Sequence, residues 1–319
     1  MQDGFAFRLY SPAPTKCSGE ALSTRIRTIK NVRPHLATAA ALAVGVTLAV
    51  AAPASAASAS AAASPAPSGL TVPLGAGYAG IGYLQDGKSF TPDTAKVQTD
   101  TSVVPALTSW GPAGVDVSHY QGTINWSSVK SAGISFAYIK ATEGTSYTDP
   151  EFSANYLHAY NAKVIRGAYH FAQPSLSSGS AQATYFAAHG GAWSADNLTL
   201  PGMLDLEGGC SGLSTTSMRS WILAFYNTYK SKTTRDVVIY TSPSWWNTCT
   251  GSWTGMSTLS PLYVADWTTA SNPTIPNGFP YATIWQYTDS GSVSGISGAV
   301  DRDRFNGTAA RLLALANNT

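Results

Sequence analysis

The sequence predicts an α/β fold, an irregular TIM-like barrel of about eight mostly parallel strands with fewer than eight helices. From residue 114 onward, short apolar runs alternate with helical stretches through the first five strands, which is typical of a parallel sheet. Eight such runs within 113–319 favour a closed barrel. A doubly wound open sheet is the structural alternative, but no glycine-rich phosphate turn follows the first strand.

The expected elements follow one another with short connections. We expect a helix over 150–162 because Asp149 is placed to cap it and Pro150 occupies its first position. Little helix is expected between the last three strands. The expected strands are 114–118, 136–144, 164–171, 202–207, 236–240, 262–267, 282–287 and 299–301, and the other expected helices are 126–132, 180–189, 214–230 and 309–316.

Residues 1–56 are expected to be an export signal. Four basic residues between 25 and 33 precede an apolar run over 36–52, and small residues then offer a cleavage site after Ala56. The run is too short and too rich in alanine for a permanent membrane span. The basic region is long for a signal, and a start downstream of Met1 would leave residues 1–22 unmade. We therefore expect a secreted, extracellular protein.

Residues 57–112 are expected to be a linker and leader segment before a catalytic domain at 113–319. The linker at 57–68 is rich in Ala, Ser and Pro. The rest, 69–112, has no sustained period and is too short for a core of its own, so we expect it to lie on the main domain.

The charge and the cysteines limit the partners. Without residues 1–56 the chain has 13 basic and 15 acidic residues, and it lacks the basic runs of a nucleic-acid-binding protein. We expect no nucleic-acid partner, no membrane contact after signal removal, no cofactor and a monomer. Cys210 and Cys249 remain, and two cysteines in an exported chain suggest one disulfide, with two free thiols as the alternative.

The motif Asp205-Leu206-Glu207 ends the fourth expected strand. Because side chains alternate along a strand, Asp205 and Glu207 lie on one side, about 6.5–7 Å apart. Two like charges at that distance push their pKa values apart, which provides one acid and one base. A solvated strand end or a salt-bridged pair is the non-catalytic alternative for such a motif.

Further acids and aromatic residues lie at the other expected strand ends. In a barrel of this kind the strand ends form the active face, so Asp116, Glu143 and Asp301 should surround the pair. Glu143 is either a sugar ligand or a structural partner of Lys140 or Arg166. Aromatic faces stack on sugar rings, which indicates a sugar-binding groove. The aromatic residues at these ends are Tyr169, His170, Trp267, Trp285 and Tyr287.

No metal site is expected. His119 and His170 are the histidines at strand ends, but neither lies in an H-E-x-x-H or H-x-x-E-H arrangement.

Six ordered segments carry a family resemblance. They are 114–122 (GVDVSHYQG), 136–144 (FAYIKATEG), 167–171 (GAYHF), 204–207 (LDLE), 284–287 (IWQY) and 300–301 (VD). Together they resemble glycoside hydrolase family 25, the Chalaropsis-type lysozymes, in its secreted actinobacterial form. The resemblance implies an irregular α/β barrel that hydrolyses the β-1,4 bond from N-acetylmuramic acid to N-acetylglucosamine in bacterial peptidoglycan.

The resemblance also implies residue roles. Glu207 matches the family's general acid and base, and Asp205 matches the acid that orients the substrate's own N-acetyl group. Asp116 and Asp301 match supporting acids of the groove. The expected substrate-binding residues are Glu143, Tyr169, Trp267, Gln286 and Tyr287. Where the family usually has Asn two residues after the last-strand aspartate, this chain has Asp303, which we expect to pair with Arg302 or Arg304 or to tune substrate preference.

Other functions are left open by the sequence. A peptidoglycan-binding barrel without catalysis is the alternative from another class, although both acids of the Asp205–Glu207 motif are intact. A chitinase-type hydrolase would show D-x-x-D-x-D-x-E spacing, which is not found around Glu207.

Overall fold

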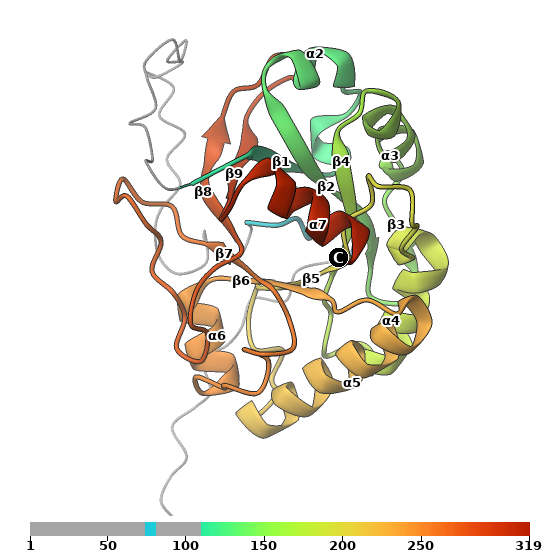
Figure 1. Ribbon diagram of the computed structural model, residues 1–319. Coiled ribbons are helices and arrows are strands. Elements are labelled where there is room, and N and C mark those ends of the chain that lie inside the picture. Colours follow the sequence, from blue (N-terminus) through green and yellow to red (C-terminus); the bar gives the residue numbers. More distant parts are fainter. Residues whose placement is uncertain (1–73, 81–109) are drawn as a thin grey trace, which may run out of the picture. The chain divides into compact units, whose positions relative to one another are not determined.

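The computed structural model describes residues 74–80 and 110–319, which all belong to one compact unit. The predicted signal at 1–56 and most of the predicted leader lie outside the described residues. Within the described part of the chain, no helix combines the length and hydrophobicity that a membrane span needs. Figure 1 shows a ring of strands with helices around it.

Eight strands close the ring, which confirms the predicted barrel. They are β1 (Ala113–Val117), β2 (Ile134–Glu143), β4 (Ile165–Phe171), β5 (Met203–Leu206), β6 (Val238–Thr241), β7 (Leu262–Ala265), β8 (Ile284–Gly291) and β9 (Val300–Phe305). The order is β1-β9-β8-β7-β6-β5-β4-β2, and β1 pairs with β2 to close the barrel. A two-residue strand, β3 (Tyr147–Thr148), pairs outside the ring with β2.

The last strand runs against its neighbours. Six barrel pairings are parallel, whereas β9 is antiparallel to both β8 and β1. Residue Asp301 therefore lies near the start of β9, not at the end of a strand as we expected. The reversal still brings Asp301 to the end of the barrel where the parallel strands finish, because it lies opposite Asp116 of β1.

The helices differ from the prediction at several places, and two of the differences have a clear local cause. The described α-helices are α2 (Trp126–Ser131), α3 (Phe152–Asn161), α4 (Gly179–Phe186), α5 (Thr215–Thr233), α6 (Pro243–Thr250) and α7 (Ala309–Asn317). Helix α6 was not predicted, although Ser242 caps it and Pro243 opens it. Helix α3 begins two residues later than expected, because Asp149 accepts the N–H of Glu151 at 3.0 Å in the turn before it.

Alternation along the strands divides the core into two layers. Along β5, Met203 belongs to the cluster inside the barrel, whereas Leu204 and Leu206 pack outward against helix residues such as Phe225 of α5. Large aromatic side chains fill the interior. They include Tyr138, Tyr169, Tyr240 and Tyr263. Helix α7 covers the end of the barrel where the parallel strands begin, because its Leu312 and Ala316 join the interior cluster.

The predicted disulfide is present between Cys210 and Cys249, whose Cα atoms are 5.1 Å apart. It joins the loop after β5 to helix α6. The bond closes a 39-residue separation, and so it limits the freedom of the unfolded chain.

We expect the double variant Cys210→Ser/Cys249→Ser to lose about 4 kcal/mol of unfolding free energy, because the unfolded chain regains the entropy that the bridge removes. Urea unfolding of parent and variant measures the loss. Reductant should lower the stability of the parent to that of the variant and leave the variant unchanged. Equal stability of oxidised parent and variant would contradict this account.

Candidate active site

Carboxyl groups gather where the parallel strands end. Asp205 is the third residue of β5, and Glu207 follows the strand directly. Asp116 lies on β1, and Glu143 is the last residue of β2. All four are buried, as is Asp301. The structure therefore brings the five predicted acids to one end of the barrel.

Asp205 lies in an environment that disfavours its ionised form. It is 1 % exposed, and neither carboxyl oxygen has a hydrogen-bond partner among the described residues. Burial raises its pKa well above the usual range, and the negative charges of Glu207 and Asp116 raise it further. The Asp205–Glu207 pair therefore retains a proton at a pH at which exposed carboxyl groups have lost theirs.

Asp116 is held by two donors from strands β7 and β8. Its Oδ2 accepts a hydrogen bond from the Tyr263 hydroxyl at 3.0 Å and from Gln286 Nε2 at 2.9 Å. Burial raises the pKa of Asp116 to about 6, against the lowering effect of these two hydrogen bonds. Burial and the charge of Asp116 also raise the pKa of Asp301 well above its usual range.

Asp303 is a further buried acid of this cluster, which the sequence did not identify as one. It is fully buried and near Asp116 and Tyr263, and its pKa is raised chiefly by burial. The expected pairing with Arg302 or Arg304 is not among the ion pairs of the described residues, because alternate residues of β9 point to opposite sides. Because side chains alternate along a strand, Asp303 lies on the same side as Asp301, which predicts that it points into the barrel.

Glu143 forms a buried ion pair with Lys140. Lys140 Nζ lies 2.7 Å from Glu143 Oε2, and Gln173 Nε2 donates to the other oxygen at 2.8 Å. Arg166 instead pairs with Asp196 at 3.0 Å. The structural partner of Glu143 is therefore Lys140 and not Arg166.

Trp267 and Gln286 form one hydrogen-bonded unit next to the acids. Gln286 Oε1 accepts from Trp267 Nε1 and from the Tyr240 hydroxyl, both at 2.9 Å, while its amide nitrogen holds Asp116. The hydroxyl groups of Tyr240 on β6 and Tyr263 on β7 were not predicted as part of the site, because both residues lie in apolar strands.

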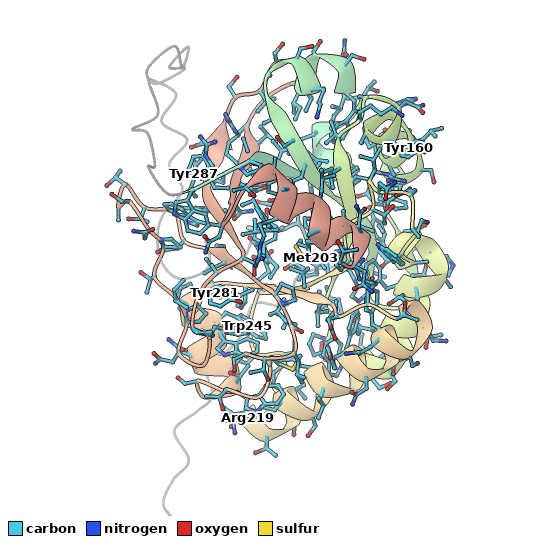
Figure 2. The ribbon with its side chains drawn as sticks, viewed as in Figure 1. Tyr160, Met203, Arg219, Trp245, Tyr281 and Tyr287 are labelled. Carbon is cyan, nitrogen blue, oxygen red and sulfur yellow. A yellow bond between two sulfur atoms is a disulfide. The ribbon has the colours of Figure 1, made fainter. Side chains whose placement is uncertain are left out.

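Tyr169 and Tyr287 lie on different sides of the barrel wall. Tyr169 is buried inside the barrel, in the same cluster as Met203. Tyr287 packs against Trp285 on the outer side, with the Arg304 guanidinium 5.7 Å from its ring centre, and Figure 2 shows it apart from Met203. The structure therefore does not bring Tyr287 together with the acids.

The two histidines have other partners. His119 Nδ1 lies 2.8 Å from Asp149 Oδ2, and His170 is buried between Thr142 and Gln182. Burial lowers the pKa of His170 to about 4, so this ring is neutral at physiological pH. Within 74–80 and 110–319, no three His, Cys, Asp or Glu side chains are placed to hold a metal ion.

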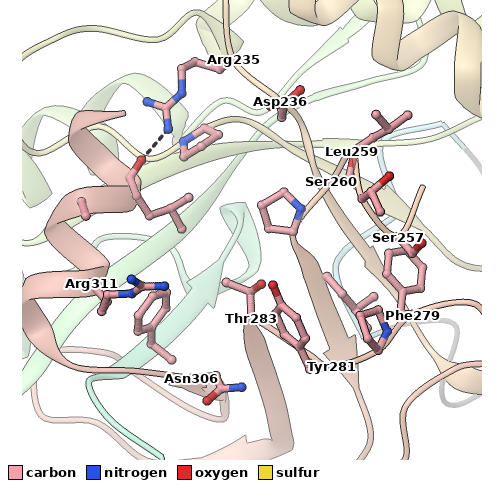
Figure 3. Close-up of a pocket in the computed structure, with 18 of the residues that line it drawn as sticks. Arg235, Asp236, Ser257, Leu259, Ser260, Phe279, Tyr281, Thr283, Asn306 and Arg311 are labelled. Carbon is pink, nitrogen blue, oxygen red and sulfur yellow. Dashed lines mark hydrogen bonds between the residues drawn. The ribbon is translucent and has the colours of Figure 1, made fainter. Parts of the chain in front are cut away.

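A cavity of about 680 Å³ lies at the other end of the barrel, where the parallel strands begin (Figure 3). Residues before β5, β6 and β8 line it together with helix α7, and one wall carries Arg235, which donates to main-chain carbonyl groups of α7. None of the predicted site residues lines this cavity. At the acid end, residues 74–80 lie against the cluster, and the Gly80 N–H donates to Glu207 Oε2 at 3.1 Å.

Comparisons with known proteins agree with this geometry. The family model for glycosyl hydrolases family 25 matches residues 115–296. The chain is 61 % identical to Lysozyme M1 of Streptomyces globisporus over 257 residues, which is 79 % of this chain and 85 % of that protein. It is 48 % identical to N,O-diacetylmuramidase of Chalaropsis sp over 200 residues, 59 % of this chain and 95 % of that protein.

A solved structure gives the same result. The bacterial lysozyme from Streptomyces coelicolor superposes with a TM-score of 0.64 at 66 % identity, over 66 % of this chain and 98 % of that one. The buried acids therefore lie in the barrel of a glycoside hydrolase, and the chain belongs to glycosyl hydrolases family 25.

Proposed function

We propose that this enzyme is a secreted 1,4-β-N-acetylmuramidase, a lysozyme that cleaves the bond from N-acetylmuramic acid to N-acetylglucosamine in bacterial peptidoglycan. The observation that carries the proposal is the buried Asp205–Glu207 pair at the centre of the acid cluster. The similar proteins from Streptomyces globisporus and Chalaropsis sp, named lysozyme and N,O-diacetylmuramidase, support the same substrate.

Glu207 acts as the general acid. The pair holds one proton, because burial and mutual repulsion oppose two negative charges in one place. With that proton on Glu207, the carboxyl group gives it to the leaving sugar oxygen as the glycosidic bond breaks. The resulting carboxylate then takes a proton from the water that completes hydrolysis.

Asp205 acts on the substrate's acetamido group. Once the proton is on Glu207, Asp205 is ionised and accepts the acetamido N–H, which makes the acetamido oxygen a better nucleophile towards the anomeric carbon. Both carboxyl oxygens of Asp205 lack a partner among the described residues, so they have the capacity to accept this hydrogen bond. This is substrate-assisted catalysis with two carboxyl groups in different roles.

The remaining residues of the cluster support the pair. Asp116, whose pKa of about 6 leaves it ionised at neutral pH, keeps the local potential negative, which favours the positive charge that develops at the anomeric carbon. Asp301 lies opposite Asp116 and supports that carboxylate. Trp267, Gln286, Tyr169 and Glu143 form the walls of the sugar-binding groove. These steps use only carboxyl groups of the chain and the substrate itself.

Export of the enzyme agrees with the proposed reaction on peptidoglycan. The substrate lies outside the cell, the basic and apolar pattern of residues 1–56 is typical of a signal, and the Cys210–Cys249 disulfide suits an oxidising compartment. We propose that the enzyme is extracellular and acts as a monomer on glycan strands.

Replacing Glu207 by Gln should lower the rate of wall lysis by about 10²–10⁴-fold while wall binding persists, because the amide cannot give a proton. Turbidity of a suspension of purified walls and a pull-down measure the two properties. Glu151→Gln, at the start of helix α3, is the matched control and should lyse as the parent does. Lysis by Glu207→Gln at the parental rate would overturn the mechanism.

The products identify the bond. Mass spectrometry of material released by the parent should show new reducing ends on N-acetylmuramic acid. Reducing ends on N-acetylglucosamine, or freed stem peptides, would contradict the proposed function. Binding to walls without any released product would favour the non-catalytic alternative.

Asp116 should make the stability fall as pH rises. Its pKa of about 6 in the folded state exceeds the ordinary value of 3.8, so between these values the folded chain binds more protons than the unfolded chain. From pH 4 to pH 7 the parent should lose about 2–3 kcal/mol more unfolding free energy than Asp116→Asn, which keeps an acceptor for Tyr263. Urea unfolding at both pH values tests this, and equal losses would contradict it.

A further inference from the structure

Residues 74–80 bind Glu207, the general acid of the proposed mechanism, and both members of the Lys140–Glu143 ion pair. The Gly80 N–H donates to Glu207 Oε2 at 3.1 Å, and the Gly77 N–H donates to Glu143 Oε2 at 3.2 Å. The Gly77 carbonyl accepts from Lys140 Nζ. The main chain of this short segment therefore donates to both carboxylates and accepts from the buried ammonium group at the acid end of the barrel.

The side chains of the segment are also placed in the groove. Ala79 is fully buried in the cluster inside the barrel. Tyr78 packs edge-on against Tyr120, with 5.2 Å between ring centres. Burial and the charges of Glu207 and Asp301 raise the pKa of Tyr78 to about 12, so its ring lies within the field of the acids.

Glycine makes this fit possible. A Cβ atom on Gly77 would lie 2.5 Å from the Phe171 ring, and one on Gly80 would lie 3.1 Å from Trp267 Cζ2. Gly80 also has a φ of +104°, a backbone conformation that other residues rarely adopt. The segment therefore contacts the groove wall with its backbone, at positions where a side chain would force it away.

A glycan and this segment cannot occupy the groove together. A sugar ring that stacks on Trp267 and hydrogen-bonds Glu207 needs the space that Gly80 fills. Because the segment is part of the same chain, it competes at an effective concentration of about millimolar, whatever the enzyme concentration.

We propose that residues 74–80 are an autoinhibitory segment that occupies the glycan-binding groove and keeps the enzyme latent. Peptide-bond hydrolysis between Gly80 and Ala113 ends the covalent tether, so that the segment dissociates and the groove opens to peptidoglycan. The inference rests on the proposed muramidase activity.

A cleavable full-length chain provides the first test. A recognition sequence for a site-specific protease is inserted between residues 90 and 91, and hydrolysis of a soluble peptidoglycan glycan is measured before and after cleavage. Cleavage should raise the rate by about tenfold or more, because the tethered competitor becomes a dilute one. Equal activity before and after cleavage would overturn the autoinhibition and leave the proposed function standing. No hydrolysis in either form would instead overturn the proposed function.

Glycine variants of the uncleaved chain show whether residues 74–80 are the inhibitor. Gly77→Ala/Gly80→Ala should raise the activity of the uncleaved chain towards that of the cleaved chain, because the new Cβ atoms meet Phe171 and Trp267. Gly133→Ala is the matched control, since Gly133 has a φ of +89° with nothing near its Cβ position and lies in the turn before β2. If the double variant stays as inactive as the uncleaved parent, residues 74–80 are not the inhibitor.

Discussion

The burial of many carboxyl groups at one end of the barrel is the constraint on which the site depends. Asp116, Asp205, Asp301 and Asp303 all have raised pKa values, and burial is the largest cause for each. The one lysine among them, Lys140, is engaged by Glu143. The cluster therefore stays protonated in part, and a general acid at neutral pH needs such a proton. The N–H groups of Gly77 and Gly80 also compensate for the burial of carboxyl groups, because they donate to Glu143 and Glu207.

The sequence predicted the barrel well because period and connection are local properties. The alternation of short apolar runs with helical stretches can be seen in consecutive residues. The number of expected strands is then enough to predict that the sheet closes into a barrel. The antiparallel direction of β9 is not a local property. It depends on the pairing of β9 with β1, which lies far away in the sequence, and with β8, to which a loop connects it. Helix α6 had a local signal at Ser242 and Pro243, but the residues that follow, mostly Ser, Trp, Asn and Thr, are weak helix formers.

The acid pair could also be predicted, because alternation puts Asp205 inside the barrel whenever Leu204 and Leu206 face the helices. The same rule, applied from Asp301 and from Gln286, places Asp303 inside and Tyr287 outside. A family motif marks positions along the chain, whereas this rule marks the face of the sheet on which a side chain lies. The binding of residues 74–80 in the groove could not be predicted, because its glycines have no period and their role depends on Phe171 and Trp267, far along the chain.

The number of protonated carboxyl groups tests the central claim most directly. Infrared spectroscopy of the full chain at pH 7 detects the carbonyl stretch of protonated carboxyl groups, which hydrogen–deuterium exchange shifts. We expect Asp205→Asn to lose one such band relative to the parent, because the variant removes the repulsion that keeps a proton on the Asp205–Glu207 pair. An unchanged set of bands would mean that the pair holds no proton at neutral pH, and the acid–base account of the site would be wrong.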